Sequence, residues 1–365
     1  MKNKVFQISA ILLLTCLFSC QEKYVDPSIK SAAEMVVVRG LITDAEGPYS
    51  VYVSHTIPFN EEEPSEYSDA LGIQGAEVII SDDSGNSEVL SEVRKGHYIT
   101  SEGGIRGIAG NTYTLSVTTP DGYNYQSKSC LLRPAPEIFS VYPVNTEEYV
   151  LVNNLYGAPT LQKRQGVGIF ADMAGLSDDD TFYRFGIRII KQTRTVYTMG
   201  PTVYCWTTTK INKRENLLVT DHLSGDSILM HHVTFLTPDE FPGNYEPSAW
   251  VYMYLDGRIV ALDIYSVSRE AYDYYSVFYN QLSAENRLFD PIPTNLTGNM
   301  YCKNDPSQTV LGIFEASGKS YMNCLVKFNA GNPKAIYQDA GYVPPDITQG
   351  CQENIKPETY QIIGY

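Results

Sequence analysis

From Met35 onward the chain consists of short runs of strand-forming residues separated by turn sequences, and this pattern constrains the fold more than any other feature. The runs that precede residue 120 are 35–42, 49–54, 76–80, 89–93 and 112–118. Asp- and Gly-containing turns separate them at 44–47, 83–86 and 120–122. Short strands at this spacing, with no helical pattern between them, predict an antiparallel sandwich whose buried face includes Tyr113, Leu115 and Val117.

The sandwich is expected to end near Arg133, because Pro134-Ala135-Pro136 interrupts the pattern. This gives a first domain over 35–133 and a second β-rich domain over 134–365. The strands expected in the second domain are 166–171, 182–191, 195–197, 226–235, 250–267, 310–315 and 321–328. Two hairpins are expected there, one at Asp256-Gly257 and one around Ser317-Gly318.

One helix is expected, at about 268–283. Ser268 is a suitable N-cap and Glu270 lies in the first turn, where a carboxylate is favourable. Tyr272, Tyr275 and Val277 follow at roughly helical spacing. The expected fold class is therefore mainly β: an N-terminal Ig-like antiparallel sandwich followed by a larger β-rich domain with one prominent helix.

The charge balance excludes one class of partner. The 365 residues include 42 Asp and Glu against 27 Lys and Arg, a net charge of −15. Nucleic-acid binding requires clustered cations, so no nucleic-acid partner is expected. With 43% hydrophobic and 19% charged residues, the chain is globular rather than disordered.

The first nineteen residues have the organisation of a secretory signal peptide. Lys2 and Lys4 precede an apolar stretch, 8–18, that is too short to span a bilayer. Leu17-Phe18-Ser19-Cys20 resembles the bacterial lipobox, so cleavage is expected between Ser19 and Cys20, with lipid attached to Cys20. The alternative is an ordinary signal peptide in which Cys20 is incidental.

If Cys20 is lipidated, its acyl chains would be the attachment of the protein to the membrane. No later stretch approaches the length of a transmembrane helix, and residues 20–34 form a polar tether. Removing 1–19 takes away two lysines and no acid, which leaves a net charge of −17 and disfavours electrostatic attachment to anionic lipid. Gln21-Glu22-Lys23 resembles the short export signals of surface lipoproteins in Bacteroidetes-type bacteria.

Two glycine motifs imitate nucleotide-binding loops. Gly166-Val167-Gly168 superficially fits a dinucleotide fingerprint, but the surrounding residues read as one strand rather than a strand-turn-helix. Gly312 and Gly318-Lys319-Ser320 imitate a phosphate loop, but their spacing is one residue too long. We therefore expect no nucleotide cofactor.

The sequence also predicts no metal site and no catalytic residue. His231 and His232 are adjacent and would face opposite sides of a strand, although a site with Asp239 and Glu240 is conceivable. Asp178–Asp180 lacks the alternating spacing of a calcium loop and is expected to be a solvated turn.

The 28 tyrosines could supply a ligand-binding platform. The candidate contacts are Trp250, Tyr252 and Tyr254, with a second cluster at Tyr272, Tyr274 and Tyr275. The simpler interpretation is that tyrosine suits half-buried strands.

Five cysteines remain after Cys16 is cleaved off and Cys20 is acylated: Cys130, Cys205, Cys302, Cys324 and Cys351. An odd number leaves at least one thiol free within a monomer. A disulfide between Cys205 and Cys351 would fix the C-terminal tail, and free buried cysteines are the alternative.

Three segments in a fixed order carry a family resemblance. They are Leu262–Tyr265 with Ser268–Tyr272, then Phe289–Asn295 with Gly298-Asn299, then Val310–Ser317. Together with the lipobox and the N-terminal sandwich, they resemble DUF4249, a family of lipoproteins of unknown function from Bacteroidetes-type bacteria. The first module is similar to the carboxypeptidase-regulatory-like sandwiches of exported proteins.

The resemblance implies an outer-membrane or cell-surface lipoprotein, often encoded near TonB-dependent receptors, with no established enzymatic activity. The leading hypothesis is that the protein binds a ligand or partner and has no catalytic activity. One candidate partner is an outer-membrane TonB-dependent receptor, to which the protein would be an accessory. The alternative is an envelope hydrolase of glycans or peptides whose carboxylates come from distant loops.

The lipobox hypothesis has a direct test. Cys20→Ala removes the thiol that would carry the lipid, so the variant should leave the membrane fraction or accumulate as unprocessed precursor. Fractionation and intact mass measurement distinguish these states. A processed, unacylated variant that still sediments with membranes would show that the anchor lies elsewhere.

Overall fold

The computed structural model describes residues 35–56, 71–153, 159–175, 181–197, 202–211, 217–218, 227–236, 245–248, 251–282, 296–326 and 349–353. The expected signal peptide, Cys20 and the tether lie outside these residues. Within them the chain is mainly β, with several largely antiparallel sheets and one helix, which confirms the expected fold class.

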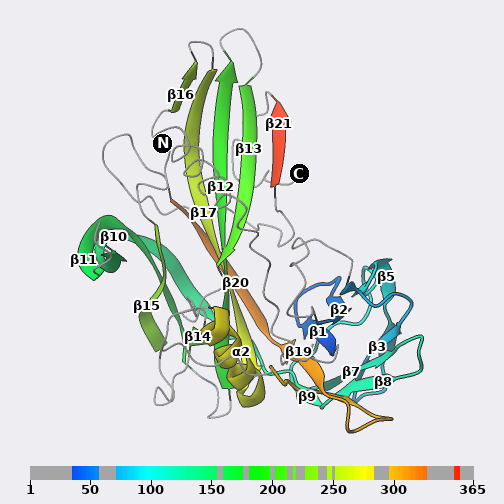
Figure 1. Cartoon of the computed structure of the whole chain (residues 1–365). Helices are drawn as coiled ribbons and strands as arrows, with labels where there is room; N and C mark the ends of the chain where they lie inside the picture. The colour runs from blue at the N-terminus through cyan, green and yellow to red at the C-terminus, as the bar shows by residue number, and fades with distance from the viewer. Residues whose placement is uncertain are drawn as a thin grey trace, which may run out of the picture.

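Two sheets form a sandwich at one side of the molecule (Figure 1). The first has the order β19-β1-β2-β6-β5. Its strands are β1 (Val36–Thr43), β2 (Ser50–His55), β5 (Ser91–Arg94), β6 (His97–Ile99) and β19 (Val310–Ser317). The second has the order β18-β8-β7-β3-β4, with β9 paired to β7. Its strands are β3 (Glu77–Asp82), β4 (Ser87–Val89), β7 (Thr112–Thr118), β8 (Asn124–Ser127), β9 (Cys130–Leu131) and β18 (Met300–Cys302).

The alternation of the sequence produces the sandwich core. Along β7 the buried residues are Tyr113, Leu115 and Val117, as the pattern predicted, and the residues between them are partly exposed. Val38 of β1 and Ile80 of β3 come from the two facing sheets and are fully buried in the same cluster.

The sandwich is completed by residues from much later in the chain. β19 pairs in parallel with the whole of β1, and β18 pairs with β8, so both sheets extend beyond the 35–133 segment expected from sequence. Phe314 of β19 lies in the sandwich core. Asn299 supports the outer edge of β19, because its side chain accepts a bond from the Phe314 N–H (2.9 Å) and donates one to the Phe314 carbonyl (2.7 Å).

Two further sheets build the rest of the molecule. The three-stranded sheet has the order β10-β11-β15, with β10 (Ile138–Asn153), β11 (Pro159–Ala174) and β15 (Ser227–Leu236). The long sheet has the order β16-β17-β12-β13-β21, with β14 and β20 also paired to it. Its strands are β12 (Thr181–Tyr197), β13 (Thr202–Ile211), β14 (Leu217–Leu218), β16 (Tyr245–Ser248), β17 (Val251–Ser268), β20 (Lys319–Val326) and β21 (Gln349–Glu353).

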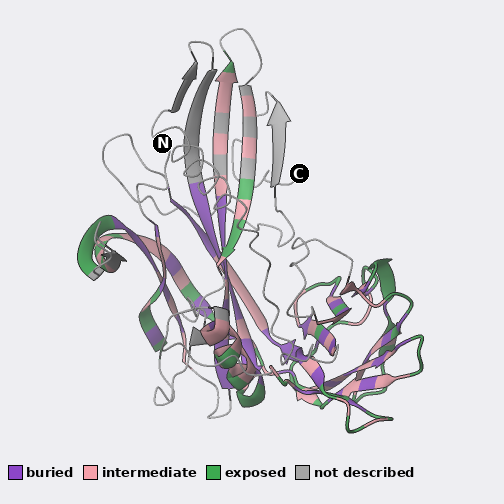
Figure 2. Cartoon of the chain, viewed as in Figure 1, coloured by how far each residue is buried: buried purple, intermediate pink, exposed green. Residues whose placement is uncertain are grey.

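A second core lies between these two sheets. Val141 and Ile169 of the three-stranded sheet and Phe185 and Leu262 of the long sheet are all fully buried in one cluster. Figure 2 shows this burial where the strands of the two sheets face each other.

The expected hairpin at Asp256-Gly257 is wrong. β17 continues through it as one strand, and β12 pairs with both of its halves. The register changes between Gln192 and Thr193, whose partners are Gly257 and Leu255, so Asp256 is accommodated as a bulge. Pairing along the whole of β12 outweighs the local turn preference of Asp-Gly.

The expected hairpin around Ser317-Gly318 is also wrong. β19 pairs with β1 in the sandwich, whereas β20 pairs with β17 in the long sheet, so the chain crosses between sheets at Gly318. A Cβ at Gly318 would lie 2.2 Å from the Ala135 nitrogen and 2.4 Å from the Arg133 carbonyl oxygen. Glycine is required here because the first crossing of the chain, at 133–136, passes directly beside the second.

The helix α2 (Arg269–Leu282) follows β17 without a loop. The Ser268 hydroxyl accepts a bond from the Ala271 N–H (3.3 Å), which confirms the expected N-cap. No helix of the described segments is long and apolar enough to cross a membrane.

The shared sandwich predicts that residues 35–133 do not fold alone. This fragment lacks Met300, Cys302, Val310, Phe314 and Ala316 of the core and leaves β1 and β8 with open edges. We expect no cooperative thermal transition by circular dichroism for the fragment, and a cooperative one when 296–318 is fused to it through a flexible linker. A cooperative transition in the fragment alone would contradict the shared core.

Candidate functional site

The helix α2 lies where the sandwich meets the long sheet. Ala271 packs with Phe182 of β12, Val267 of β17 and Ile313 of β19, so one face of the helix is buried against both parts of the molecule. The Tyr272 ring stacks on the Phe182 ring at 4.8 Å between centroids. The opposite face of the helix remains available to form a surface site.

A buried ion pair joins the two parts beneath the helix. The Arg184 guanidinium of β12 lies 2.8 Å from the Glu315 carboxylate of β19, and their side chains are 12% and 2% exposed. The guanidinium carbon lies 4.3 Å from the ring centroid of Tyr265 and 4.7 Å from that of Tyr275 on α2. Burial opposes the charge on Arg184, but the attraction of Glu315 outweighs it and raises the pKa of Arg184 well above its usual value.

A second group of charges continues this junction. Asp263 of β17 lies 3.4 Å from the Arg188 guanidinium and 3.0 Å from the Lys319 ammonium. The Lys319 N–H donates to the Asp44 carboxylate of the sandwich at 2.7 Å. Lys319, at the second crossing of the chain, therefore contacts a carboxylate of the long sheet through its ammonium and a carboxylate of the sandwich through its backbone N–H.

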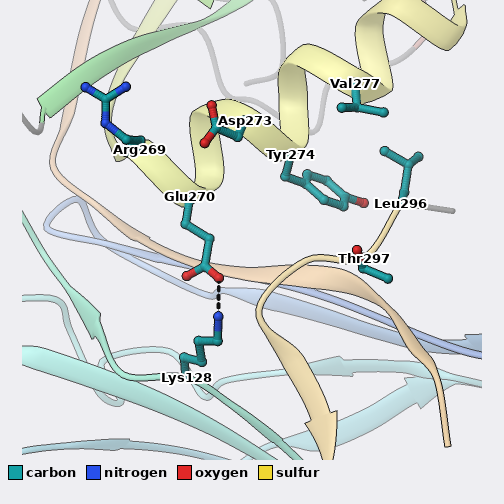
Figure 3. A pocket seen from close by; sticks show the side chains of 8 residues that line it. All are labelled: Lys128, Arg269, Glu270, Asp273, Tyr274, Val277, Leu296 and Thr297. Atoms are coloured by element: carbon teal, nitrogen blue, oxygen red, sulfur yellow. Dashed lines mark hydrogen bonds and ion pairs between the residues drawn. The ribbon is translucent and has the colours of Figure 1, made fainter. Parts of the chain in front are cut away.

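A cleft of about 600 Å³ opens between the exposed face of α2 and the sandwich (Figure 3). Its lining residues carry charges of both signs, one phenol and two aliphatic groups: Lys128, Arg269, Glu270, Asp273, Tyr274, Val277, Leu296 and Thr297. The Lys128 ammonium reaches across the cleft to the Glu270 carboxylate at 2.6 Å. These side chains are 61% and 44% exposed, so the pair is solvated and a ligand can displace it at low cost.

The two tyrosines at the centre of α2 have different roles. Tyr275 is buried against Arg184, and burial raises the pKa of its phenol. Tyr274 lines the cleft; burial raises the pKa of its phenol, and Arg39 of β1 opposes this shift. Tyr274 therefore keeps its proton and can donate a hydrogen bond to a ligand at neutral pH.

This arrangement is suited to binding. The cleft offers cations, carboxylates, a phenol and apolar contacts, and the described residues that line it include no His, Cys or Ser. Within the described segments no group of three or more His, Cys, Asp or Glu side chains could hold a metal ion. Glu270 and Asp273 do share the cleft, one helical turn apart.

The structure does not describe the side chains of the first group of aromatic contacts named from sequence. Trp250 lies outside the described residues. Tyr252 and Tyr254 lie in β17, paired with Val196 and Arg194, and the structure describes their backbone only. Of the second tyrosine cluster, Tyr274 alone lines the cleft.

Sequence reasoning did not find Lys128, Leu296 or Thr297, and it did not link Arg184 with Glu315. Lys128 is 142 residues from Glu270, and Arg184 is 131 residues from Glu315. No local pattern relates such pairs; only the return of the chain to the sandwich brings them together.

The cysteines divide into two groups. Cys205 is disulfide-bonded, and its partner in the register of β13 and β21 is Cys351. The pairing of Cys205 with Cys351 stays a prediction that this register supports. Cys130, Cys302 and Cys324 are free, and burial raises the pKa of Cys130 and of Cys324 to about 12, which makes these two thiols unreactive.

The histidines face opposite sides of β15, as the strand pattern predicted. His231 points inward and meets the Phe185 ring edge-on at 5.0 Å, and His232 points outward to the Phe170 ring at 5.4 Å. Asp239 and Glu240, the other members of the conceivable metal site, lie outside the described residues, as does Asp178–Asp180.

Comparison with known families gives one match. A family model described as a domain of unknown function (DUF4249) matches residues 22–321, which include the sandwich, the three-stranded sheet, α2 and the start of β20. No curated protein matches the chain.

Removing one partner of the buried pair of Arg184 and Glu315 is predicted to destabilise the protein much more than removing both. Arg184→Met leaves the Glu315 carboxylate buried without its partner and should lower the free energy of unfolding by about 3–5 kcal/mol. Arg184→Met/Glu315→Leu should recover much of this loss, since no charge is then left buried. Urea denaturation measures both. Lys163→Met breaks the exposed pair with Glu147 and is the control, with no measurable change expected. A double variant less stable than Arg184→Met would contradict this account.

The burial of His231 predicts that the fold loses stability in acid. Burial, and secondarily His232, lowers the pKa of His231 to about 4. The unfolded chain then binds the proton more readily than the folded one, so stability should fall as the pH drops from about 6.5 towards 4. The urea midpoint of the native protein should decrease between pH 7 and pH 5 more than that of His231→Gln. His232→Gln, on the exposed side, should stay close to the native protein, because burial is the larger cause of the lowered pKa of His231. A pH dependence of His231→Gln equal to that of the native protein would exclude His231 as the cause.

Proposed function

The chain belongs to the DUF4249 family, and on this premise we propose that it is a lipid-anchored protein of the outer membrane or cell surface that binds a ligand or partner without catalysing a reaction. The lipobox at 17–20, which resembles that of Bacteroidetes-type lipoproteins, supports the anchor. The observation that carries the binding role is the cleft between α2 and the sandwich.

The chemistry of the cleft favours a polar protein segment as the bound group. Lys128 and Glu270 pair with each other in the free protein, so they can exchange that contact for opposite charges on a partner. Tyr274 and Val277 supply a small apolar contact between the charged groups. An outer-membrane TonB-dependent transporter is the partner we propose, with this protein as its accessory.

The test is co-purification of the native lipoprotein from gently solubilised outer membranes. Lys128→Glu and Glu270→Lys each place like charges opposite one another in the cleft and should reduce the recovered transporter at least about tenfold, if each costs about 1.4 kcal/mol of binding. Glu102→Lys, an exposed charge reversal in a turn of the sandwich, is the control and should retain the partner. Equal recovery of the transporter with all variants would show that the cleft does not bind it.

The second candidate is a hydrolase, but its carboxylates would be Glu270 and Asp273, which line one cleft three residues apart on a helix, rather than residues of distant loops as expected from sequence. Glycosidases use a pair of carboxylates on either side of the bond that they cleave, so this candidate requires both side chains to turn toward one ligand. Purified protein that hydrolysed glycans, peptides or esters at a rate abolished by Asp273→Asn would establish this candidate and overturn the proposal of a protein without catalytic activity.

A further inference from the structure

The outward face of the three-stranded sheet carries a row of aromatic rings. Tyr142 of β10, Phe170 of β11 and His232 of β15 are directly opposite one another in the strand register. The centroids of the Tyr142 and Phe170 rings are 6.3 Å apart, and those of the Phe170 and His232 rings are 5.4 Å apart. The row therefore crosses all three strands on the side away from the core.

The glycines of the Gly166-Val167-Gly168 motif have a role here that nucleotide binding does not explain. A Cβ at Gly168 would lie 2.8 Å from the Phe170 ring, so this ring packs over the backbone of Gly168. A Cβ at Gly166 would lie 2.6 Å from the end of the Phe235 ring, which covers that position in the same way. Phe170 and Phe235 are both partly exposed, as expected for rings with one side against the backbone and the other towards solvent.

A hydrogen-bonded carboxylate fixes one end of this surface. Asp172 accepts bonds from the Ser140 hydroxyl (3.0 Å), the Tyr142 hydroxyl (3.2 Å) and the Met230 N–H (2.8 Å). Met230 has φ = 55°, a left-handed conformation that non-glycine residues seldom adopt, and it lies where the register of β11 and β15 is irregular. Strain of this kind at a bulge, stabilised by a dedicated side chain, is typical of functional surfaces.

The charge of the face restricts its ligand. The segments 140–146, 166–172 and 230–235 contain no Lys, Arg or Glu, and Asp172 is their one charged residue. A surface without cations does not attract phosphates, anionic sugars or anionic lipid. Hydroxyl and imidazole groups of Ser140, Thr146 and His232 border the rings and suit a neutral ligand that is rich in hydroxyls.

We propose that the outward face of the three-stranded sheet, formed by Tyr142, Phe170, His232 and Phe235 over Gly166 and Gly168, binds a neutral saccharide. The apolar face of a sugar ring would stack on Phe170 and Phe235, and its hydroxyls would bond to Asp172, Ser140 and His232. This site is separate from the cleft at α2, and it does not depend on the proposed transporter partner or on lipidation.

The test is affinity electrophoresis of the folded protein through native gels that contain neutral soluble polysaccharides: starch, xyloglucan, β-glucan, mannan or arabinan. At least one should retard the protein, and Phe170→Ala should weaken that binding about tenfold, as loss of one aromatic stacking contact predicts. Gly168→Ala keeps every ring but displaces that of Phe170, so it should weaken binding to a similar extent without unfolding the chain.

Three controls distinguish binding at this site from nonspecific adsorption and from binding at the cleft. Tyr149→Ala removes a tyrosine that is 62% exposed elsewhere on β10 and should bind as the native protein does. Phe170→Tyr keeps the ring and should retain binding, and Lys128→Glu, in the cleft at α2, should have no effect. Thermal melting checks that each variant is folded.

Two results would overturn the proposal. One is no retardation by any of the polysaccharides. The other is retardation that Phe170→Ala and Gly168→Ala leave unchanged. Binding of phosphatidylcholine vesicles, abolished by the same two variants in place of polysaccharide binding, would assign the face to a lipid surface and would also contradict a saccharide site.

Discussion

The ion pair between Arg184 and Glu315 is the interaction on which the arrangement of this molecule depends. It joins a strand of the long sheet to a strand of the sandwich, and the guanidinium also lies against the Tyr275 ring of α2. Both charges are almost fully removed from water, so each is tolerable only while the other is in place. The two sheets and the helix are therefore fixed in one geometry. One wall of the cleft is α2, and the contact of Tyr275 with Arg184 holds this helix in place, so the pair helps to fix that wall.

The two surfaces proposed for binding lie in different parts of the fold and use different chemistry. The cleft at α2 has charges of both signs that are paired in the free protein, which suits exchange with a charged protein partner. The outward face of the three-stranded sheet has rings, hydroxyls and a single carboxylate. Neither surface includes a residue of the other, so occupation of one leaves the residues of the other free to bind.

Local patterns in the sequence predicted local structure well and long-range structure poorly. The alternation of Tyr113, Leu115 and Val117 and the cap at Ser268 depend on neighbouring residues, and both were confirmed. The hairpin expected at Asp256-Gly257 was wrong because a partner strand, invisible in the local pattern, stabilises β17 on both sides of the turn signal. The cleft could not be predicted for the same reason: Lys128 and Glu270 meet only because residues 300–317 return to the sandwich.

That return also determines the order in which the chain can fold. The strand β1 needs β19 as its neighbour, and the two are separated by more than half of the chain. Contacts of such high sequence separation form slowly and late, because a long loop must close before they are made. On the proposed export route the sandwich would stay incomplete until β18 and β19 had emerged, so the segment that leads the chain would still lack its edge strands while the rest passed a translocation channel.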